Sequence, residues 1–265
     1  MKLSSALACL AGASLLIPST VSAQVFSGTG TGAIPDGGMN GPADWGTPLN
    51  VTFNVAGLAA PIMDISLSIT LYHPYVGDLE AVLIPPTGSG ASSFVIFSGI
   101  GQQVNLGDPT LGSPGTFGAF PPLSSPEAYT YTFSDSASGN LWAAAGFDTT
   151  SGNSNFENIF DLPAGSYRTS VAGPWDEVGN PNGGNHNAGQ LTSFALDTGF
   201  VGLTSSQANG TWTLRLRDGS QFDVGTVTAA TMTLVPVPEP SKYAIAAGIG
   251  LLVFAGYRRY SAGKA

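Results

Sequence analysis

The sequence predicts an all-β protein, a β-sandwich of the jelly-roll type, with an N-terminal signal peptide before it and a short C-terminal hydrophobic helix after it. Three observations carry this prediction. The 36 glycines and 19 prolines punctuate short segments rich in Val, Ile, Thr, Phe and Tyr. Several of these segments alternate between apolar and polar residues. Long amphipathic helical patterns are absent between the two ends of the chain.

The predicted strands follow one another at short intervals. Residues 49–55 and 63–71 alternate with a period of two, so that one face is apolar and the other is small and polar, as in a half-buried sandwich strand. Residues 211–217 alternate in the same way and stop at Asp218. Further strands are expected at 78–84, 94–97, 129–133 and 226–235. About eight strands joined by Gly-rich loops favour a jelly roll.

The N-terminus is typical of a secretory signal peptide, residues 1–23. Lys2 supplies the positive end, residues 6–17 form the apolar stretch, and a small-x-small cleavage site ends at Ala23. The single cysteine, Cys9, ends a segment that loosely resembles a lipoprotein box, so a lipoprotein signal is the alternative to an ordinary signal peptide. After cleavage at Ala23 the mature chain has no cysteine, hence no disulfide.

Residues 24–236 form one predicted domain of 213 residues, long enough for a sizeable core. It carries 3 basic and 16 acidic residues, a net charge of −13. Nucleic acid is therefore excluded as an expected partner, because phosphate binding needs clustered Lys and Arg. Divalent cations are the natural complement of excess carboxylate, and the alternative is that the acidity serves only solubility.

The C-terminal segment, residues 237–265, has three parts. Pro238, Glu239 and Pro240 form an extended triplet, residues 244–256 are 13 uncharged residues, and Arg258 and Arg259 follow. This segment resembles the PEP-CTERM sorting signal of exported bacterial proteins. The resemblance implies handling by an exosortase-like enzyme of the inner membrane. A full membrane span needs about 20 apolar residues, so the segment would insert only as a thin or distorted span, or else be a buried helix.

Several motifs in the middle of the chain resemble the P domain, also called P/Homo B, which would make the sandwich galactose-binding-like. Residues 69–80 resemble its I-x-H-x-Y-x-G-D-L strand pair, and residues 83–88 its L-x-x-P-x-G turn. Residues 133–137 and 162–168 resemble two further elements, although Thr169 replaces a family proline. The segment 209–226 resembles the G-x-W-x-L ending, so the match runs in order over about residues 50–234.

The resemblance implies a secreted domain that is not catalytic, adds stability and often involves calcium. The residues agree that the chain is not an enzyme, because they include no G-x-S-x-G, no H-E-x-x-H and no Cys nucleophile. The two histidines are His73 and His186. A triad assembled from distant residues stays an alternative, since triads are defined by geometry.

Calcium is the expected cofactor, because loops rich in carboxylates and carbonyls supply the oxygens it prefers. The alternative for each carboxylate is a local role, such as bonding turn amides. The candidate metal ligands are Asp78, Glu80, Asp135, Asp218 and Asp223.

The loop 173–190 is a candidate glycan site. Trp175 would offer a stacking face, while Asp176 and Asn185 would bond sugar hydroxyls. The alternative is a solvated connection. Two functions are therefore expected as competitors: a non-catalytic cell-surface or extracellular-matrix protein linked to polysaccharide and biofilm, or a carbohydrate-binding module with a defined ligand.

Overall fold

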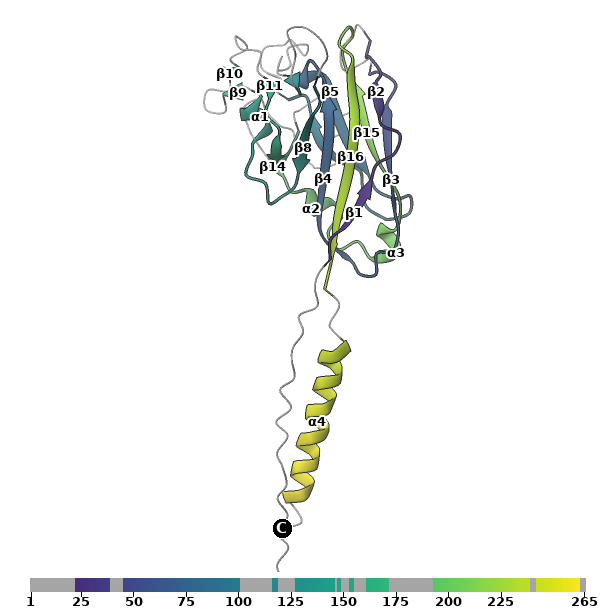
Figure 1. Ribbon diagram of the computed structural model, residues 1–265, viewed down its shortest axis with the longest axis vertical. Helices are drawn as coiled ribbons and strands as arrows, with labels where there is room; N and C mark the ends of the chain where they lie inside the picture. Colours follow the sequence, from purple (N-terminus) through teal and green to yellow (C-terminus); the bar gives the residue numbers. More distant parts are fainter. Residues whose placement is uncertain are drawn as a thin grey trace, which may run out of the picture. The chain divides into compact units, whose positions relative to one another are not determined.

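The computed structural model describes residues 22–38, 45–100, 116–118, 127–145, 147–148, 153–154, 161–171, 193–238 and 242–262. Two compact units divide the chain: Ser22–Val237, and a second unit to which Pro238–Ala265 belongs. The first unit is the all-β sandwich that the sequence predicts (Figure 1).

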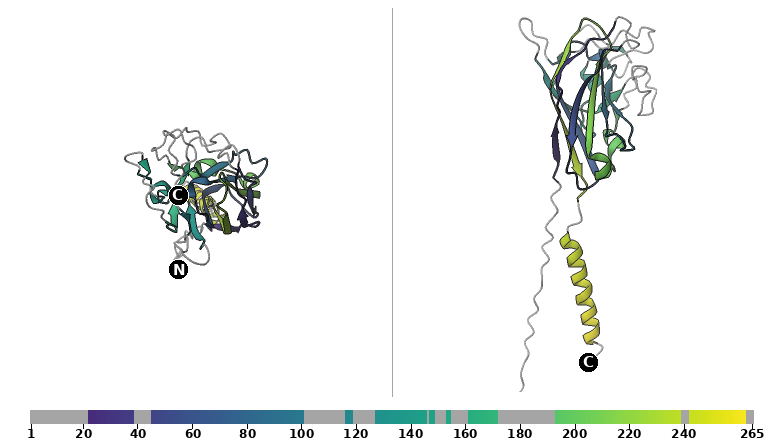
Figure 2. Two further views of the ribbon diagram at one scale, coloured as in Figure 1. Left: turned by 90° about the horizontal axis from the view of Figure 1, so that it is seen from above. Right: turned by 90° about the vertical axis from the view of Figure 1, so that its right-hand side faces the viewer.

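Two six-stranded sheets make up the sandwich, and Figure 2 shows them as two layers. The first sheet runs, in spatial order, β1 (Gln24–Ser27), β16 (Gly225–Pro236), β4 (Ile62–Tyr72), β8 (Tyr129–Phe133) and β12 (Gly165–Tyr167), with β2 (Gly32–Ile34) also paired to β16. The second runs β14 (Ser193–Phe194), β13 (Thr169–Val171), β6 (Phe94–Ser98), β5 (Leu79–Ile84), β15 (Gly210–Asp218) and β3 (Leu49–Val55).

Smaller elements complete the described part. Two short ladders pair β7 (Thr116–Phe117) with β11 (Asp161–Leu162) and β9 (Phe147–Asp148) with β10 (Asn153–Ser154). A 3-10 turn, Val76–Asp78, precedes β5. The helices are α1 (Leu141–Ala144), α2 (Leu196–Phe200), α3 (Ser205–Ala208) and α4 (Lys242–Ala262).

Each strand expected from the sequence is present, with ends shifted by no more than one residue. The alternation also places the side chains as expected. On β4 the inward positions Ile65, Leu67, Ile69 and Leu71 have no exposed surface, and on β15 Trp212, Leu214 and Leu216 have none either. Residues from both sheets form one continuous hydrophobic core.

Trp212 is the largest side chain buried in this core. Its indole N–H donates to the Ala208 carbonyl at 2.8 Å, which satisfies its one polar atom. Its ring meets Phe200 edge to face, with 5.0 Å between the ring centroids. Trp212 therefore joins β15 to both α2 and α3.

The second unit contains helix α4, in which the apolar run continues into Arg258 and Arg259. Its large apolar side chains are exposed, including Leu251, Leu252 and Phe254. β16 ends at Pro236 and α4 begins at Lys242, so neither element includes Pro238. Within the described residues, no helix combines the length and the apolar character needed to cross a membrane.

We predict that Trp212→Ala lowers the free energy of unfolding by about 3–5 kcal/mol, because it opens a large cavity and removes the contact with Phe200. Urea denaturation followed by circular dichroism measures this. Val25→Ala, at a side chain that is 63% exposed, is the control and should change stability by no more than about 0.5 kcal/mol. Equal effects of the two changes would contradict the core assignment.

Candidate functional site

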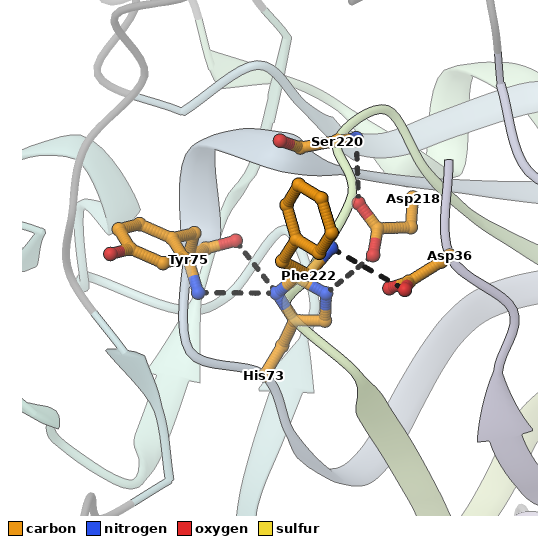
Figure 3. Close-up of polar contacts among 6 residues, drawn as sticks. All are labelled: Asp36, His73, Tyr75, Asp218, Ser220 and Phe222. Atoms are coloured by element: carbon orange, nitrogen blue, oxygen red, sulfur yellow. Dashed lines mark hydrogen bonds and ion pairs between the residues drawn. The ribbon is translucent and has the colours of Figure 1, made fainter. Parts of the chain in front are cut away.

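On β4 and β15, which belong to opposite sheets, the series of inward-facing apolar side chains ends in a polar residue. On β4 the row of Ile65 to Leu71 continues, two residues on, to His73. On β15 the row of Trp212 to Leu216 ends at Asp218. His73 and Asp218 have no exposed surface, so they meet inside one end of the sandwich (Figure 3).

The His73 imidazole bonds on both sides. Its Nε2 lies 3.1 Å from Asp218 Oδ2, and its Nδ1 lies 2.8 Å from the Tyr75 carbonyl oxygen. The Tyr75 backbone N–H also approaches Nδ1, at 3.2 Å. Tyr75 therefore offers Nδ1 both an acceptor and a donor, so that the imidazolium and the neutral tautomer with its hydrogen on Nε2 each find partners on both sides.

Backbone hydrogen bonds hold Asp218 and the turn that follows it in place. Its Oδ1 accepts the Ser220 N–H at 2.9 Å, as in a turn closed by an aspartate, and its backbone carbonyl accepts the Gly46 N–H at 2.9 Å. The Gly219 N–H donates to the Asp78 carbonyl at 2.8 Å. These bonds tie the turn after β15 to the segment before β5 and leave Asp218 Oδ2 directed at His73.

The loop from β15 to β16 brings a second carboxylate, Asp223. This loop includes Phe222, which adopts a left-handed backbone with φ 77°, a conformation that residues other than glycine rarely take. The Phe222 N–H donates to Asp36 Oδ2 at 3.4 Å, a long bond that holds the loop (Figure 3). The next residue, Asp223, is 5% exposed.

Asp78 and Asp223 carry strongly raised pKa values. The pKa of Asp223 is about 8, first because burial disfavours the charged carboxylate, and then because Asp218 and Asp78 add negative charge nearby. The pKa of Asp78 is about 6, again chiefly from burial, although His73 lowers it. When the carboxyl groups of Asp78 and Asp223 are both ionised, neither can donate a hydrogen bond to the other. Both Asp223 oxygens then lack a hydrogen-bond partner. A proton shared between the two carboxyl groups relieves this.

The cluster of His73, Asp78, Asp218 and Asp223 is therefore short of positive charge. His73, Asp218 and Asp223 each offer one ligand atom, and these three atoms all lie within 4.8 Å of one another. The basic side chain Arg215 is engaged elsewhere, by Glu80 at 3.5 Å. Buried charge of one sign needs a counterion, so the cluster is suited to hold protons or a metal ion.

Calcium was the expected cofactor, and the cluster meets its needs only in part. Calcium takes six to eight oxygens. The cluster offers three carboxylates and a fully buried imidazole nitrogen. Calcium binding here stays a hypothesis.

Three of the five candidate metal ligands come together: Asp78, Asp218 and Asp223. Glu80 lies outside the cluster, because alternation along β5 turns it to the opposite side from Leu79 and Ala81, where it pairs with Arg215. Asp135 also lies outside it.

The Asp135 carboxylate caps helix α2. It accepts the backbone N–H groups of Leu196 at 2.6 Å and Asp197 at 2.9 Å, which the short helix leaves without internal partners. Both of its oxygens are therefore engaged in a local structural role.

His73 is the site residue that the ligand prediction missed. The signal was present in the sequence, since continuing the period of two from Ile65 and Leu71 places His73 on the inward face. The candidate glycan ligands Trp175, Asp176 and Asn185 lie outside the described residues.

The sorting residues are described in part. Ala23 immediately precedes β1, Pro238 follows β16 and is exposed, and Arg258 and Arg259 lie exposed in α4. Glu239 and Pro240 lie outside the described residues.

No family model and no curated protein matches the chain. Among solved structures, the crystal structure of a serine protease of Aeromonas sobria is 12% identical with a TM-score of 0.36, and the match covers 82% of this chain and 27% of that one. The same organism's serine protease in complex with the chaperone ORF2 is 13% identical, with a TM-score of 0.35 and coverage of 82% and 26%. The chain thus spans about a quarter of these structures, and a likeness at this level carries no argument about activity.

We predict that Gly225→Ala destabilises the sandwich by about 1–3 kcal/mol, because the added methyl group would overlap His73 Cδ2 and crowd the Tyr72 carbonyl. Gly32→Ala is the matched control, since Gly32 lies on β2 beside the same strand and a methyl group there meets nothing within 4 Å. Chemical denaturation compares the two. If Gly225→Ala is as stable as Gly32→Ala, His73 does not pack against Gly225.

We also predict that the metal-free protein loses stability as pH rises from about 4 to about 9. The pKa values of Asp78 and Asp223, about 6 and about 8, lie above the ordinary value of 3.8. The folded state thus keeps protons that the unfolded chain releases, and the stability they contribute is lost as pH rises through the folded-state values. The loss is on the order of a few kcal/mol.

Urea titrations in EDTA at several pH values measure this dependence. Asp223→Asn should make the decline smaller without removing it, because burial also raises the pKa values of Asp78 and Asp197 to about 6. Glu127→Gln, at an exposed carboxylate, should leave the decline unchanged. A decline that is identical in Asp223→Asn and the unmodified protein would show that other groups cause it.

Proposed function

We propose that this protein is an exported, non-catalytic cell-surface or extracellular-matrix protein, built on a P-domain-like jelly roll and sorted through a PEP-CTERM tail. The observation that carries the non-catalytic part is the burial of His73 and Asp218, each with no exposed surface. A general acid–base pair must come within hydrogen-bond reach of its substrate. This pair instead bonds to the main chain of its own fold, at Tyr75 and Ser220.

The start of the sandwich supports export with cleavage after Ala23. The next residue, Gln24, is the first of β1 and pairs with Leu234 on β16. Cleavage at Ala23 would therefore release the domain without removing a residue of its sheets. This agreement between a processing site and a strand boundary is expected of a secreted domain.

The C-terminal unit supports sorting. Helix α4 presents exposed Leu251, Leu252 and Phe254, and within its own unit this apolar surface suits lipid or a membrane enzyme better than water. Arg258 and Arg259 would stay at the cytoplasmic face of the inner membrane. In this proposal an exosortase-like enzyme acts at the accessible Pro238–Pro240 triplet while α4 engages the membrane as a short, incomplete insertion. The mature protein then joins the surface or the polysaccharide matrix.

We predict that replacing Pro238 and Pro240 by Ala blocks delivery. In an exporting bacterium with an exosortase-like enzyme, the protein with both changes should accumulate in the inner-membrane fraction, with its C-terminal tail intact by mass spectrometry. Pro61→Ala is the control, because Pro61 is an exposed proline of the sandwich outside the tail. Delivery of the double variant to the cell surface at the level of the Pro61→Ala control would refute the sorting role.

A further inference from the structure

We propose that His73 Nε2 and the carboxylates of Asp218 and Asp223 bind one divalent transition-metal ion of the zinc class inside the sandwich. Asp78 lies at the edge of this site as a fourth ligand or a hydrogen-bonding neighbour. The proposal does not depend on where the protein is sorted, because it rests on the interior of the folded domain.

The separations suit a small ion. Four ligands placed 2.0–2.2 Å from a tetrahedral zinc ion lie about 3.3–3.6 Å from one another. Here the three ligand atoms all lie within 4.8 Å of one another, and His73 Nε2 is 3.1 Å from Asp218 Oδ2. A pair of ligand atoms at the 4.8 Å limit reaches about 3.6 Å if the two side chains together move by about 1.2 Å, which small side-chain rotations supply.

The groups behind the ligands orient them for metal. A histidine that binds a metal through one nitrogen donates the other N–H to a carbonyl or carboxylate. His73 Nδ1 lies 2.8 Å from the Tyr75 carbonyl, which leaves Nε2 directed into the cluster. Asp218 is held likewise: Oδ1 accepts the Ser220 N–H, and Oδ2 faces the site (Figure 3).

Asp223 supplies the independent reason to expect a ligand. It is 5% exposed, and no N–H or hydroxyl donor among the described residues reaches either of its oxygens, so its hydrogen-bonding neighbour there is another acidic group, the carboxyl group of Asp78. Burying an unpaired carboxylate is unfavourable by several kcal/mol, and proteins that retain such a group pair it or coordinate it. The left-handed Phe222 just before it shows that the loop accepts backbone strain to place Asp223 there.

The ligand types distinguish the zinc class from calcium. Imidazole nitrogen suits zinc, copper, iron and nickel, whereas calcium prefers oxygen only and more ligands than this interior supplies. The backbone carbonyls of Tyr75, Asp78 and Asp218 already accept hydrogen bonds from His73, Gly219 and Gly46, which leaves them less suited as extra oxygen ligands.

The experiment uses the full chain, purified in mild detergent and freed of metal with a chelator. Because His73 and Asp218 have no exposed surface, the ion is added during refolding from urea. Zinc content after dialysis and the melting temperature are then measured with Zn²⁺ or Ca²⁺. One zinc per chain is expected. With zinc at about 100 times its dissociation constant, the melting temperature should rise by about 5–10 °C.

Asp223→Asn tests the site itself. The change keeps the shape of the side chain and replaces a carboxyl group whose ionised form is unfavourable beside Asp78 and Asp218, so the metal-free variant should melt at the same temperature as the unmodified protein or higher. Its zinc affinity should fall at least about tenfold. Glu127→Gln, which removes an exposed carboxylate, should leave zinc affinity unchanged.

Three results would overturn the proposal: no saturable zinc binding, zinc binding that Asp223→Asn leaves intact, or a calcium-induced rise in melting temperature as large as that for zinc. If Asp223→Asn does not fold, Co²⁺ replaces zinc in the unmodified protein. Intense visible absorption typical of a four-coordinate nitrogen and oxygen site would support the proposal, and the weak spectrum of hydrated Co²⁺ would refute it.

Discussion

The contact between His73 and Asp218 is the interaction on which the rest of this end of the molecule depends. It joins the two sheets through polar atoms 3.1 Å apart, at the point where the inward-facing apolar side chains of β4 and β15 end. Removing one partner of a buried hydrogen bond leaves the other polar group unsatisfied, which typically destabilises a protein by about 1–3 kcal/mol, and by more where that group is charged. The surrounding turns are bonded accordingly: Tyr75 to the imidazole, Ser220 to the carboxylate, and Gly219 to Asp78.

The same alternation that forms the core also creates the need for a counterion. Apolar residues fill the inward positions along most of β4 and β15, and then the inward positions become His73 and Asp218, with Asp223 arriving from the loop before β16. Three carboxylates around one imidazole can be compensated by protons or by one divalent ion. Either solution stabilises the fold, and both agree with the structural role that we propose for the cluster.

The sequence predicted the sheets well and the site in part, for physical reasons. Residues 49–55 and 211–217 alternate cleanly, and they form β3 and β15. Short strands such as β12 and β13 were not predicted, because three residues are too few to show a period. Asp78, Asp218 and Asp223 were predicted as ligands from their residue type. Glu80 and Asp135 look alike in sequence, yet Glu80 faces the other side of β5 and Asp135 caps α2, and only tertiary structure separates these cases.

The most direct measurement is X-ray diffraction at the zinc absorption edge from crystals of the protein grown with equimolar zinc. We expect one strong anomalous peak inside the sandwich, about 2.0–2.1 Å from His73 Nε2 and about 2.0–2.2 Å from oxygens of Asp218 and Asp223. An interior without anomalous density, with Nε2 still bonded to Asp218, would contradict the metal site and leave protons as the only counterions of this cluster.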